Sequence, residues 1–208
     1  MAGLSSIHEN KALNRADTVL FTVLTAVMAL APLPLASNRP FPAAILGGGL
    51  GLLLIAWASI TAWRRAALPV PVGQIRIPLF LFSMVCLWIF VQSLAIYPIN
   101  LADPIWGLAL PQLSVKGTNA PLSICPTAST TGLMHILIYF SVFWLSLQLG
   151  RNGIRAQLAL RAVVWVGAVY SLYGLVVYFS GNDTILIFKK WAYKGSLTST
   201  FVNRNNFA

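Results

Sequence analysis

Long stretches without a charged side chain alternate with short basic segments along this chain of 208 residues. Because an α-helix rises about 1.5 Å per residue, roughly 20 apolar residues cross the ~30 Å hydrocarbon core of a bilayer. Spans are predicted where the charge-free stretches reach that length, at 18–37, 41–63, 77–97, 131–149 and 161–180. The chain turns apolar again at about residue 200, which predicts the start of a sixth span. The pattern therefore predicts an all-α fold, a polytopic transmembrane helix bundle.

The composition agrees with a membrane protein. Hydrophobic residues make up 58% of the chain and charged residues 9%, whereas soluble domains carry about 25% charged residues. No repeat or low-complexity tract divides the sequence, so a single membrane domain over 1–208 is the simplest organisation. The first apolar stretch is longer than the ~7–15 apolar residues of a cleavable secretory signal. We therefore expect it to be retained as a span.

Lysine and arginine are unevenly divided between alternate connections of the predicted spans. Cytoplasmic connections are enriched in these residues. Up to about residue 180, most of them fall in one set of connections: Lys11, Arg15, Arg64, Arg65, Arg76, Arg151, Arg155 and Arg161. This distribution predicts a cytoplasmic N-terminus and makes the connections 98–130 and 181–199 external.

Turn-forming residues shape the expected connections. Proline, glycine and asparagine recur in 98–130, which predicts irregular structure with one interfacial turn around Trp106. Pro32 and Pro34 are expected to kink or end the first helix. Residues 184–193 mix apolar side chains with lysines, which suits a short element lying on the external interface.

Basic residues also occur on the predicted external face, against the usual bias. The net charge of +10 would favour nucleic-acid binding in a soluble protein, but most basic residues here flank spans, so we expect no nucleic acid partner. The external group consists of Arg39, Lys116, Lys189, Lys190, Lys194 and Arg204. Such a group indicates an anionic ligand, since guanidinium and ammonium groups bind phosphate oxygens. The alternative is that these side chains reach towards lipid phosphates.

Other kinds of chemistry have little support in the sequence. The chain has four acidic residues, and none lies in a predicted span, which argues against a cation-coupled transporter. Cys86 lies within a span and Cys125 in a connection, and no zinc-type or redox spacing occurs, so we expect no metal and no cofactor. His135 could transfer protons near the end of the fourth span, but a neutral imidazole bonded to a neighbouring helix is the simpler interpretation.

Four stretches of the chain resemble one family of membrane proteins. Residues 195–208, GSLTSTFVNRNNFA, resemble the GTFxNxNHFA motif of the O-antigen ligase and O-antigen polymerase-like proteins. The stretches 37–40 (SNRP), 122–130 (LSICPTAST) and 170–175 (YSLYGL) are similar to the same family and occur in the same order. The residues assigned to the terminal motif are Phe201, Asn203, Asn205 and Asn206.

The chain also departs from the family pattern. Ser199 stands where the family usually has glycine, and Asn206 stands where many members have histidine. Cys125 occupies a position that is commonly acidic.

The resemblance implies a multi-span glycosyltransferase of the bacterial inner membrane. Such an enzyme moves a glycan from undecaprenyl diphosphate to a sugar hydroxyl at the periplasmic face, without a metal. Its partners would be the lipid-linked glycan, membrane lipid and other polysaccharide-assembly proteins. Arg39, Lys189, Lys190 and Arg204 are then the candidate ligands of the diphosphate, whose negative charge they would hold as it leaves.

No catalytic residue is assigned within this chain. In the family, the large periplasmic loop with its catalytic histidine and further arginines follows the terminal motif. The sequence therefore looks like the N-terminal part of such a protein, and we expect this polypeptide alone to be inactive as a transferase. The alternative function is that of a non-catalytic multi-pass protein that binds or assembles polysaccharide lipid intermediates.

Overall fold

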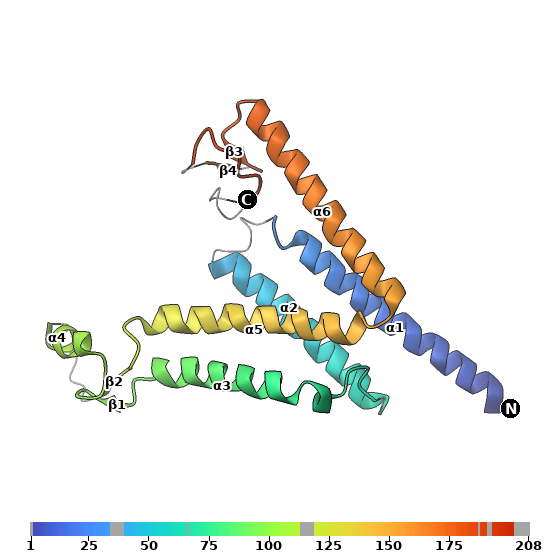
Figure 1. Cartoon of the computed structure of the whole chain (residues 1–208), viewed down its shortest axis with the longest axis horizontal. Helices are drawn as coiled ribbons and strands as arrows, with labels where there is room; N and C mark the ends of the chain where they lie inside the picture. Colours follow the sequence, from blue (N-terminus) through green and yellow to red (C-terminus); the bar gives the residue numbers. More distant parts are fainter. Residues whose placement is uncertain are drawn as a thin grey trace. The chain divides into compact units, whose positions relative to one another are not determined.

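The described part of the chain is mainly α-helical. A computed structural model describes residues 2–33, 40–65, 67–112, 119–186, 188–190 and 193–201, and of 2–14, 40 and 188 the backbone alone. Six α-helices lie in these residues (Figure 1): α1 (Ala2–Leu30), α2 (Pro40–Trp63), α3 (Arg76–Ser93), α4 (Pro104–Gln112), α5 (Pro126–Leu149) and α6 (Gly153–Phe179). A 3₁₀ turn, η2 (Val72–Gln74), precedes α3. Two antiparallel strand pairs complete it, β1 (Tyr97–Pro98) with β2 (Asn119–Ala120) and β3 (Thr184–Ile185) with β4 (Phe188–Lys189).

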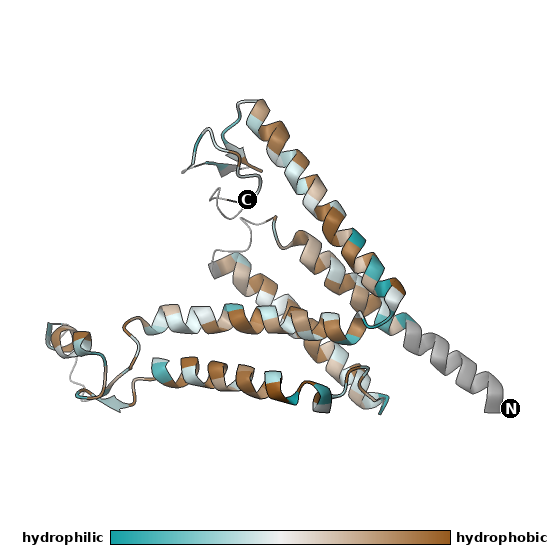
Figure 2. Ribbon diagram, viewed as in Figure 1, coloured by the Kyte–Doolittle hydropathy of each residue, from teal (hydrophilic) through white to brown (hydrophobic). Residues whose placement is uncertain are grey.

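Four of the described helices are long and apolar enough to cross a membrane, which indicates a membrane protein. They are α2, α3, α5 and α6. Within the protein, none of the apolar stretch of α3 and 6% of that of α6 is buried, and Figure 2 shows apolar residues along these helices. The side chains of α1 are described only from Arg15 onward. The first and sixth spans and the orientation of the N-terminus stay predictions.

The helix boundaries differ from the limits of the charge-free stretches. The span predicted at 41–63 coincides with α2, whereas α3 ends at Ser93 rather than near 97. Helix α6 begins at Gly153, well before 161, because the Asn152 side chain accepts a hydrogen bond from the N–H of Ile154 at 2.9 Å and caps the helix. Absence of charge marks the apolar part of a helix, but capping residues decide where the helix begins.

Proline residues lie at the start of the helix that contains the fourth predicted span and just after the helix that corresponds to the first. Helix α5 starts at Pro126 instead of 131, since proline is well suited to the first helical position. Helix α1 ends at Leu30, shortly before Pro32, as expected. Residues 34–37 of the predicted first span lie outside the described residues.

The connection 98–130 is more ordered than its sequence indicated. The turn predicted around Trp106 is part of the nine-residue helix α4, and strands β1 and β2 pair across the connection. The prediction of irregular structure was therefore wrong for 104–112. It failed because short elements of this kind are set by contacts made after the chain folds back, which local composition does not encode.

The chain divides into two compact units, which we describe separately. The first contains Met1–Val70 and Ser141–Ala208, and the second contains Pro71–Phe140. The single membrane domain inferred from the sequence stays a prediction.

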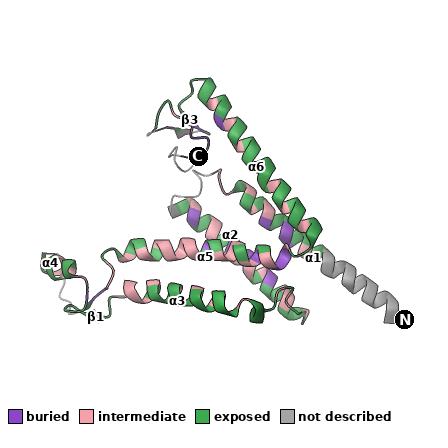
Figure 3. Ribbon diagram, in the orientation of Figure 1, coloured by how far each residue is buried: buried purple, intermediate pink, exposed green. Residues whose placement is uncertain are grey.

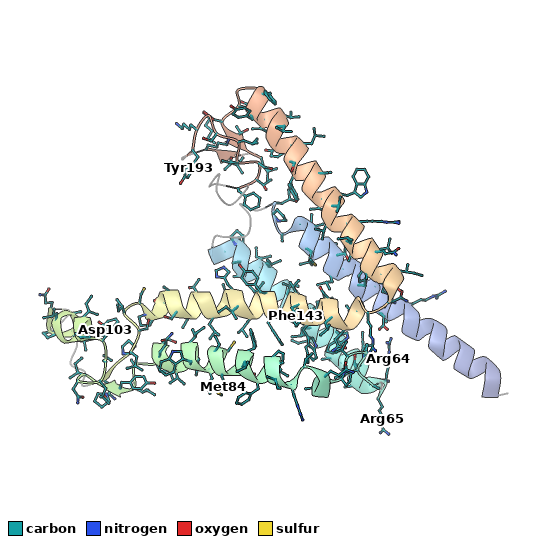
Figure 4. The ribbon with its side chains drawn as sticks, viewed as in Figure 1. Arg64, Arg65, Met84, Asp103, Phe143 and Tyr193 are labelled. Carbon is teal, nitrogen blue, oxygen red and sulfur yellow. The ribbon has the colours of Figure 1, made fainter. Side chains whose placement is uncertain are left out.

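In the first unit, α1 lies beside α2 and α6. Asp17 accepts a hydrogen bond from Arg64 Nη1 at 3.1 Å, and Figure 4 shows Arg64 turned towards α1 while Arg65 points away. Arg155 Nη2 donates to Thr18 Oγ1 at 3.1 Å, and Tyr170 donates its hydroxyl hydrogen to Ala29 O at 2.9 Å. These two contacts occur in the same order along both helices, so α1 and α6 run parallel.

In the second unit, a cap formed by residues 94–125 joins α3 to α5. Ser123 is the centre of its described part. The Ser123 N–H donates to Gln92 O of α3 at 3.0 Å, and its carbonyl accepts from Trp106 Nε1 of α4 at 3.1 Å. Its hydroxyl lies 2.8 Å from that of Ser129 in α5. A single residue thus connects three helices. Phe82 of α3 stacks on Phe140 of α5, with ring centroids 4.4 Å apart.

Candidate functional site

The candidate site lies at the C-terminal end of α6, where the chain reverses. The N–H of Gly181 donates to Tyr178 O and that of Asn182 to Val177 O, a hydrogen-bond pattern that ends helices. Gly181 has a φ of 67°, in the left-handed region that glycine adopts without steric strain. This turn sends the chain back along α6 into the hairpin of β3 and β4.

The hairpin is attached to α6. The Tyr173 hydroxyl of α6 accepts a hydrogen bond from the N–H of Leu186 at 2.7 Å. Ile185 is buried, with 1% of its surface exposed. The described part of the element expected at 184–193 therefore contains a strand pair held against a helix.

Asp183 and Lys190 organise the chain that follows the hairpin. The Asp183 carbonyl accepts from the N–H of Lys190, and its carboxylate accepts from the N–H of Gly195, both at 2.9 Å. Lys190 is 5% exposed, and its ammonium donates to Ser196 O at 2.9 Å. A buried ammonium is costly unless it is hydrogen-bonded. Lys190 thus holds the chain in place, whereas its neighbour Lys189 is exposed.

Residues 193–201, here called the returning segment, fold back onto α6. The Ser199 hydroxyl donates to Tyr170 O at 2.7 Å. Gly174 is the buried residue of α6, and Figure 3 shows that most of this helix is exposed. A Cβ at Gly174 would lie 2.9 Å from Ser199 Cβ and 3.2 Å from Ser199 Cα. Glycine is required at 174 because the returning segment approaches the helix too closely for any side chain.

The backbone of the returning segment is unusual at Ser199. Its φ is 49°, in the left-handed region that favours glycine. The Ser199 hydrogen bond to α6 compensates part of the resulting strain. Tyr193, at the start of the segment, also has a positive φ and lies on the side away from α6 (Figure 4).

An apolar groove of about 400 Å³ runs between α1 and α6. Its floor and walls come from Thr25, Met28, Ala29, Pro32, Ala159, Ala162, Val163, Val166, Gly167, Tyr170, Ser171 and Phe201. Small residues on α6 leave the space, and Phe201 of the returning segment contributes an aromatic ring. The volume is within the range of small-molecule sites, about 300–1,000 Å³.

Two buried hydroxyl groups of the returning segment have unmet hydrogen-bonding capacity. Thr198 and Thr200 are each 1% exposed. Within the described residues, neither Oγ1 has a hydrogen-bond partner. Buried hydroxyls without a partner are rare, and a ligand or water is a frequent explanation. Thr200 directly precedes Phe201, so these groups belong to the segment that contributes to the groove.

The structure describes only some of the residues singled out from the sequence. Lys189 is exposed, Lys190 is buried, and Phe201 lines the groove. The others lie outside the described residues: Arg39, Asn203, Arg204, Asn205 and Asn206. The Nε2 atom of His135 is buried and has no partner in the part of the chain that the structure describes. In that same part, no group of three or more His, Cys, Asp or Glu residues could hold a metal ion.

Several residues of the site were not assigned individually from the sequence. Tyr170, Tyr173 and Gly174 are spaced to share one face of a helix, and this spacing is a signal that could have identified the docking face. The sequence singled out Ser199 only as a departure from the family motif, and Asp183 offered no comparable signal, because its role depends on the N–H groups of Lys190 and Gly195.

In comparisons with known proteins, no protein-family model, no curated protein and no solved structure matches this chain. The family resemblance therefore rests on the sequence motifs given above.

Proposed function

We propose that the chain belongs to an O-antigen ligase- or polymerase-type glycosyltransferase of a bacterial inner membrane. Its part in the reaction is to hold undecaprenyl diphosphate, the lipid that donates the glycan to a sugar hydroxyl at the periplasmic face. Two of the four stretches that carry the family resemblance, 170–175 and 195–208, contact each other in the described structure.

The observation that carries the proposal is the backbone conformation of Ser199. The family motif has glycine at this position, and Ser199 adopts a φ of 49° that glycine tolerates best. A left-handed residue at this position supports the resemblance, because glycine is the residue that best suits such a conformation. Gly174 supports the same conclusion, since it lies in the second stretch and contacts Ser199.

The groove suits the lipid part of such a donor. It is predominantly lined by apolar side chains and lies between helices, one of which is long and apolar enough to span the bilayer. A branched hydrocarbon chain entering it would exchange contacts with lipid tails for contacts with α1 and α6. Phe201 would then contact the isoprene units nearest the diphosphate, because it belongs to the segment beyond the end of α6.

The polar part of the donor would meet the returning segment and the hairpin. Lys189 is exposed and offers an ammonium to a phosphate oxygen, while Lys190 fixes the backbone beside it through Ser196. The Thr198 and Thr200 hydroxyls can donate hydrogen bonds that no described residue accepts. This arrangement would stabilise negative charge on a departing diphosphate.

The groove is tested by filling it. The chain is reconstituted in nanodiscs and labelled with a photoreactive polyprenyl diphosphate. We expect labelling of α1 and α6 peptides, and at least a tenfold loss of labelling in Ala162→Phe. Val164→Phe is the matched control, since Val164 is 62% exposed on the same helix and does not line the groove. Equal labelling of the two variants would contradict the proposal.

The reaction is tested by reversing charge at Lys189. In cells that make a full-length version carrying the family's periplasmic loop, Lys189→Glu should reduce polysaccharide transfer at least tenfold, whereas Lys189→Arg, which keeps the charge, should retain it. Lipid binding without any transfer in that full-length version would favour the alternative, a non-catalytic protein that binds polysaccharide lipid intermediates. Unchanged transfer in Lys189→Glu would leave this lysine without a role in the donor site.

A further inference from the structure

The cap of the second unit carries an apolar surface in a place where a water-facing connection would be polar. Its exposed apolar side chains are Ile96, Ile99, Leu101, Ile105, Leu108 and Ile124. Leu108 is 74% exposed and Leu101 63%. Within the described residues, Asp103 is the cap's one charged side chain. An exposed apolar surface of this extent marks a site of contact with a membrane or a partner.

Helix α4 is apolar on both of its faces. Trp106, Ala109 and Leu110 are partly buried against the cap, while Ile105 and Leu108 lie on the opposite, exposed face. The helix contains no charged residue. A helix that is apolar all round is normally covered on all sides by protein or by lipid.

The direction of α4 agrees with lipid as the cover. In Figure 1, α3 runs across the view while α4 is seen nearly end-on at the end of the α3–α5 pair, so α4 lies roughly crosswise to α3. Helices α3 and α5 are both long and apolar enough to span the membrane. A crosswise helix at the ends of two membrane-spanning helices would lie along the membrane surface.

Fixed contacts hold α4 in this position. The Asp103 carboxylate accepts a hydrogen bond from the N–H of Ile105 at 3.0 Å and stabilises the N-terminus of α4. The one charged side chain in the described part of the cap is therefore hydrogen-bonded within the cap. Trp106 Nε1 donates to Ser123 O, so the indole hydrogen bond is satisfied within the protein. These two hydrogen bonds hold α4 in place, with Ile105 and Leu108 on its exposed face.

From these observations we infer that α4 lies in the interface of the bilayer, with Leu101, Ile105 and Leu108 inserted among the upper parts of the lipid acyl chains. Interfacial helices usually combine an apolar face with basic residues that attract anionic lipids. Helix α4 has no basic residue, so its insertion depends on apolar contact alone. It does not depend on lipid charge or on salt concentration.

The inference is tested with one nitroxide label in the whole chain, in nanodiscs of phosphatidylcholine. The label is placed at Leu108→Cys, with Cys86 and Cys125 replaced by serine. Asn119→Cys, an exposed polar position in β2 of the same cap, is the matched control. We expect the label at 108 to collide at least threefold more often with oxygen, which dissolves in lipid, than with a water-soluble nickel chelate. The label at 119 should show the reverse preference.

Two outcomes would overturn the inference. One is equal access of the nickel chelate to both labels; the other is a lipid preference at 108 that appears only when anionic lipid is added. A second measurement needs no label. In the native chain, replacing Leu108 by lysine should speed hydrogen exchange of the α4 amides at least tenfold while leaving the α3 amides unchanged. Unchanged α4 exchange would count against burial of this face in lipid.

Discussion

The two long connections that follow apolar helices, 94–125 and 181–201, differ in which kind of side chain they bury. Both fold into a pair of two-residue strands. The cap exposes leucine and isoleucine, whereas the connection after α6 buries Lys190 and the run from Thr198 to Thr200. Lys190 and Ser199 donate to backbone carbonyls, whereas the hydroxyls of Thr198 and Thr200 have no partner within the described residues. One connection thus presents apolar side chains outward, and the other encloses polar ones.

The means of attachment differ as well. The cap is held by hydrogen bonds that converge on Ser123. The returning segment is held by close backbone approach at Gly174. The second kind of attachment tolerates less change in volume, and variants at the two sites should therefore differ in their effects.

The largest effect is expected from Gly174→Ala. The added methyl group would lie 2.9 Å from Ser199 Cβ and 3.2 Å from its Cα, so the returning segment must move away from α6. Overpacking of this kind lowers the free energy of unfolding by about 1–3 kcal/mol. Unfolding in mixed detergent micelles measures this loss, and faster hydrogen exchange at 195–201 would locate it. Gly167→Ala on the same helix has no atom within 4 Å of the new Cβ and should be nearly neutral.

A smaller loss is expected from Ser123→Ala in the cap. The hydroxyl contacts Ser129 and accepts from the N–H of Cys125, while the backbone contacts to α3 and α4 would remain. Loss of such hydrogen bonds lowers the unfolding free energy by about 1 kcal/mol. Ser83→Ala is the control, because the Ser83 hydroxyl bonds only within its own helix, to Leu79 O. A loss as large as that of Gly174→Ala would remove the contrast between the two attachments.

The smallest effect is expected from Ser199→Gly, which should be less destabilising than Ser199→Ala. Ser199→Ala loses the hydrogen bond to Tyr170 O and keeps the positive φ, so we expect a loss of about 1 kcal/mol. Ser199→Gly loses the same bond but relieves the backbone, which offsets roughly 0.5–1 kcal/mol. Unfolding of the two variants in parallel measures the difference. Greater stability of the alanine variant would show that the left-handed conformation is not maintained in the membrane.

The sequence predicted the long helices better than what connects them. The charge-free stretch predicts the limits of α2 to within one residue. It does so because a helix needs an apolar stretch of a fixed length to cross the bilayer, and that length can be read directly from the local sequence. For helix α4 the sequence predicted only a turn around Trp106. The contact that fixes this helix is made with Ser123, seventeen residues further along the chain. Short elements that depend on such contacts carry almost no local signal.

The candidate site was predicted in outline only. The motif around Phe201 pointed to the segment that does contribute to the groove. The burial of Lys190 could not be predicted, because lysine is normally exposed and its acceptor is a backbone carbonyl that any residue would supply. The requirement for glycine at 174 likewise depends on Ser199, a residue in a different segment of the chain.

The hydrogen bond between Tyr170 and Ala29 joins residues 141 positions apart. Ribosomes extend a chain at roughly 5–20 residues per second, so Tyr170 is synthesised roughly 7–30 s after Ala29. During that interval α1 is already made, but the helix that forms the other wall of the groove does not yet exist. The groove between α1 and α6 therefore forms late in membrane insertion. A lipid can occupy it only after α6 has been inserted beside α1, which was synthesised much earlier.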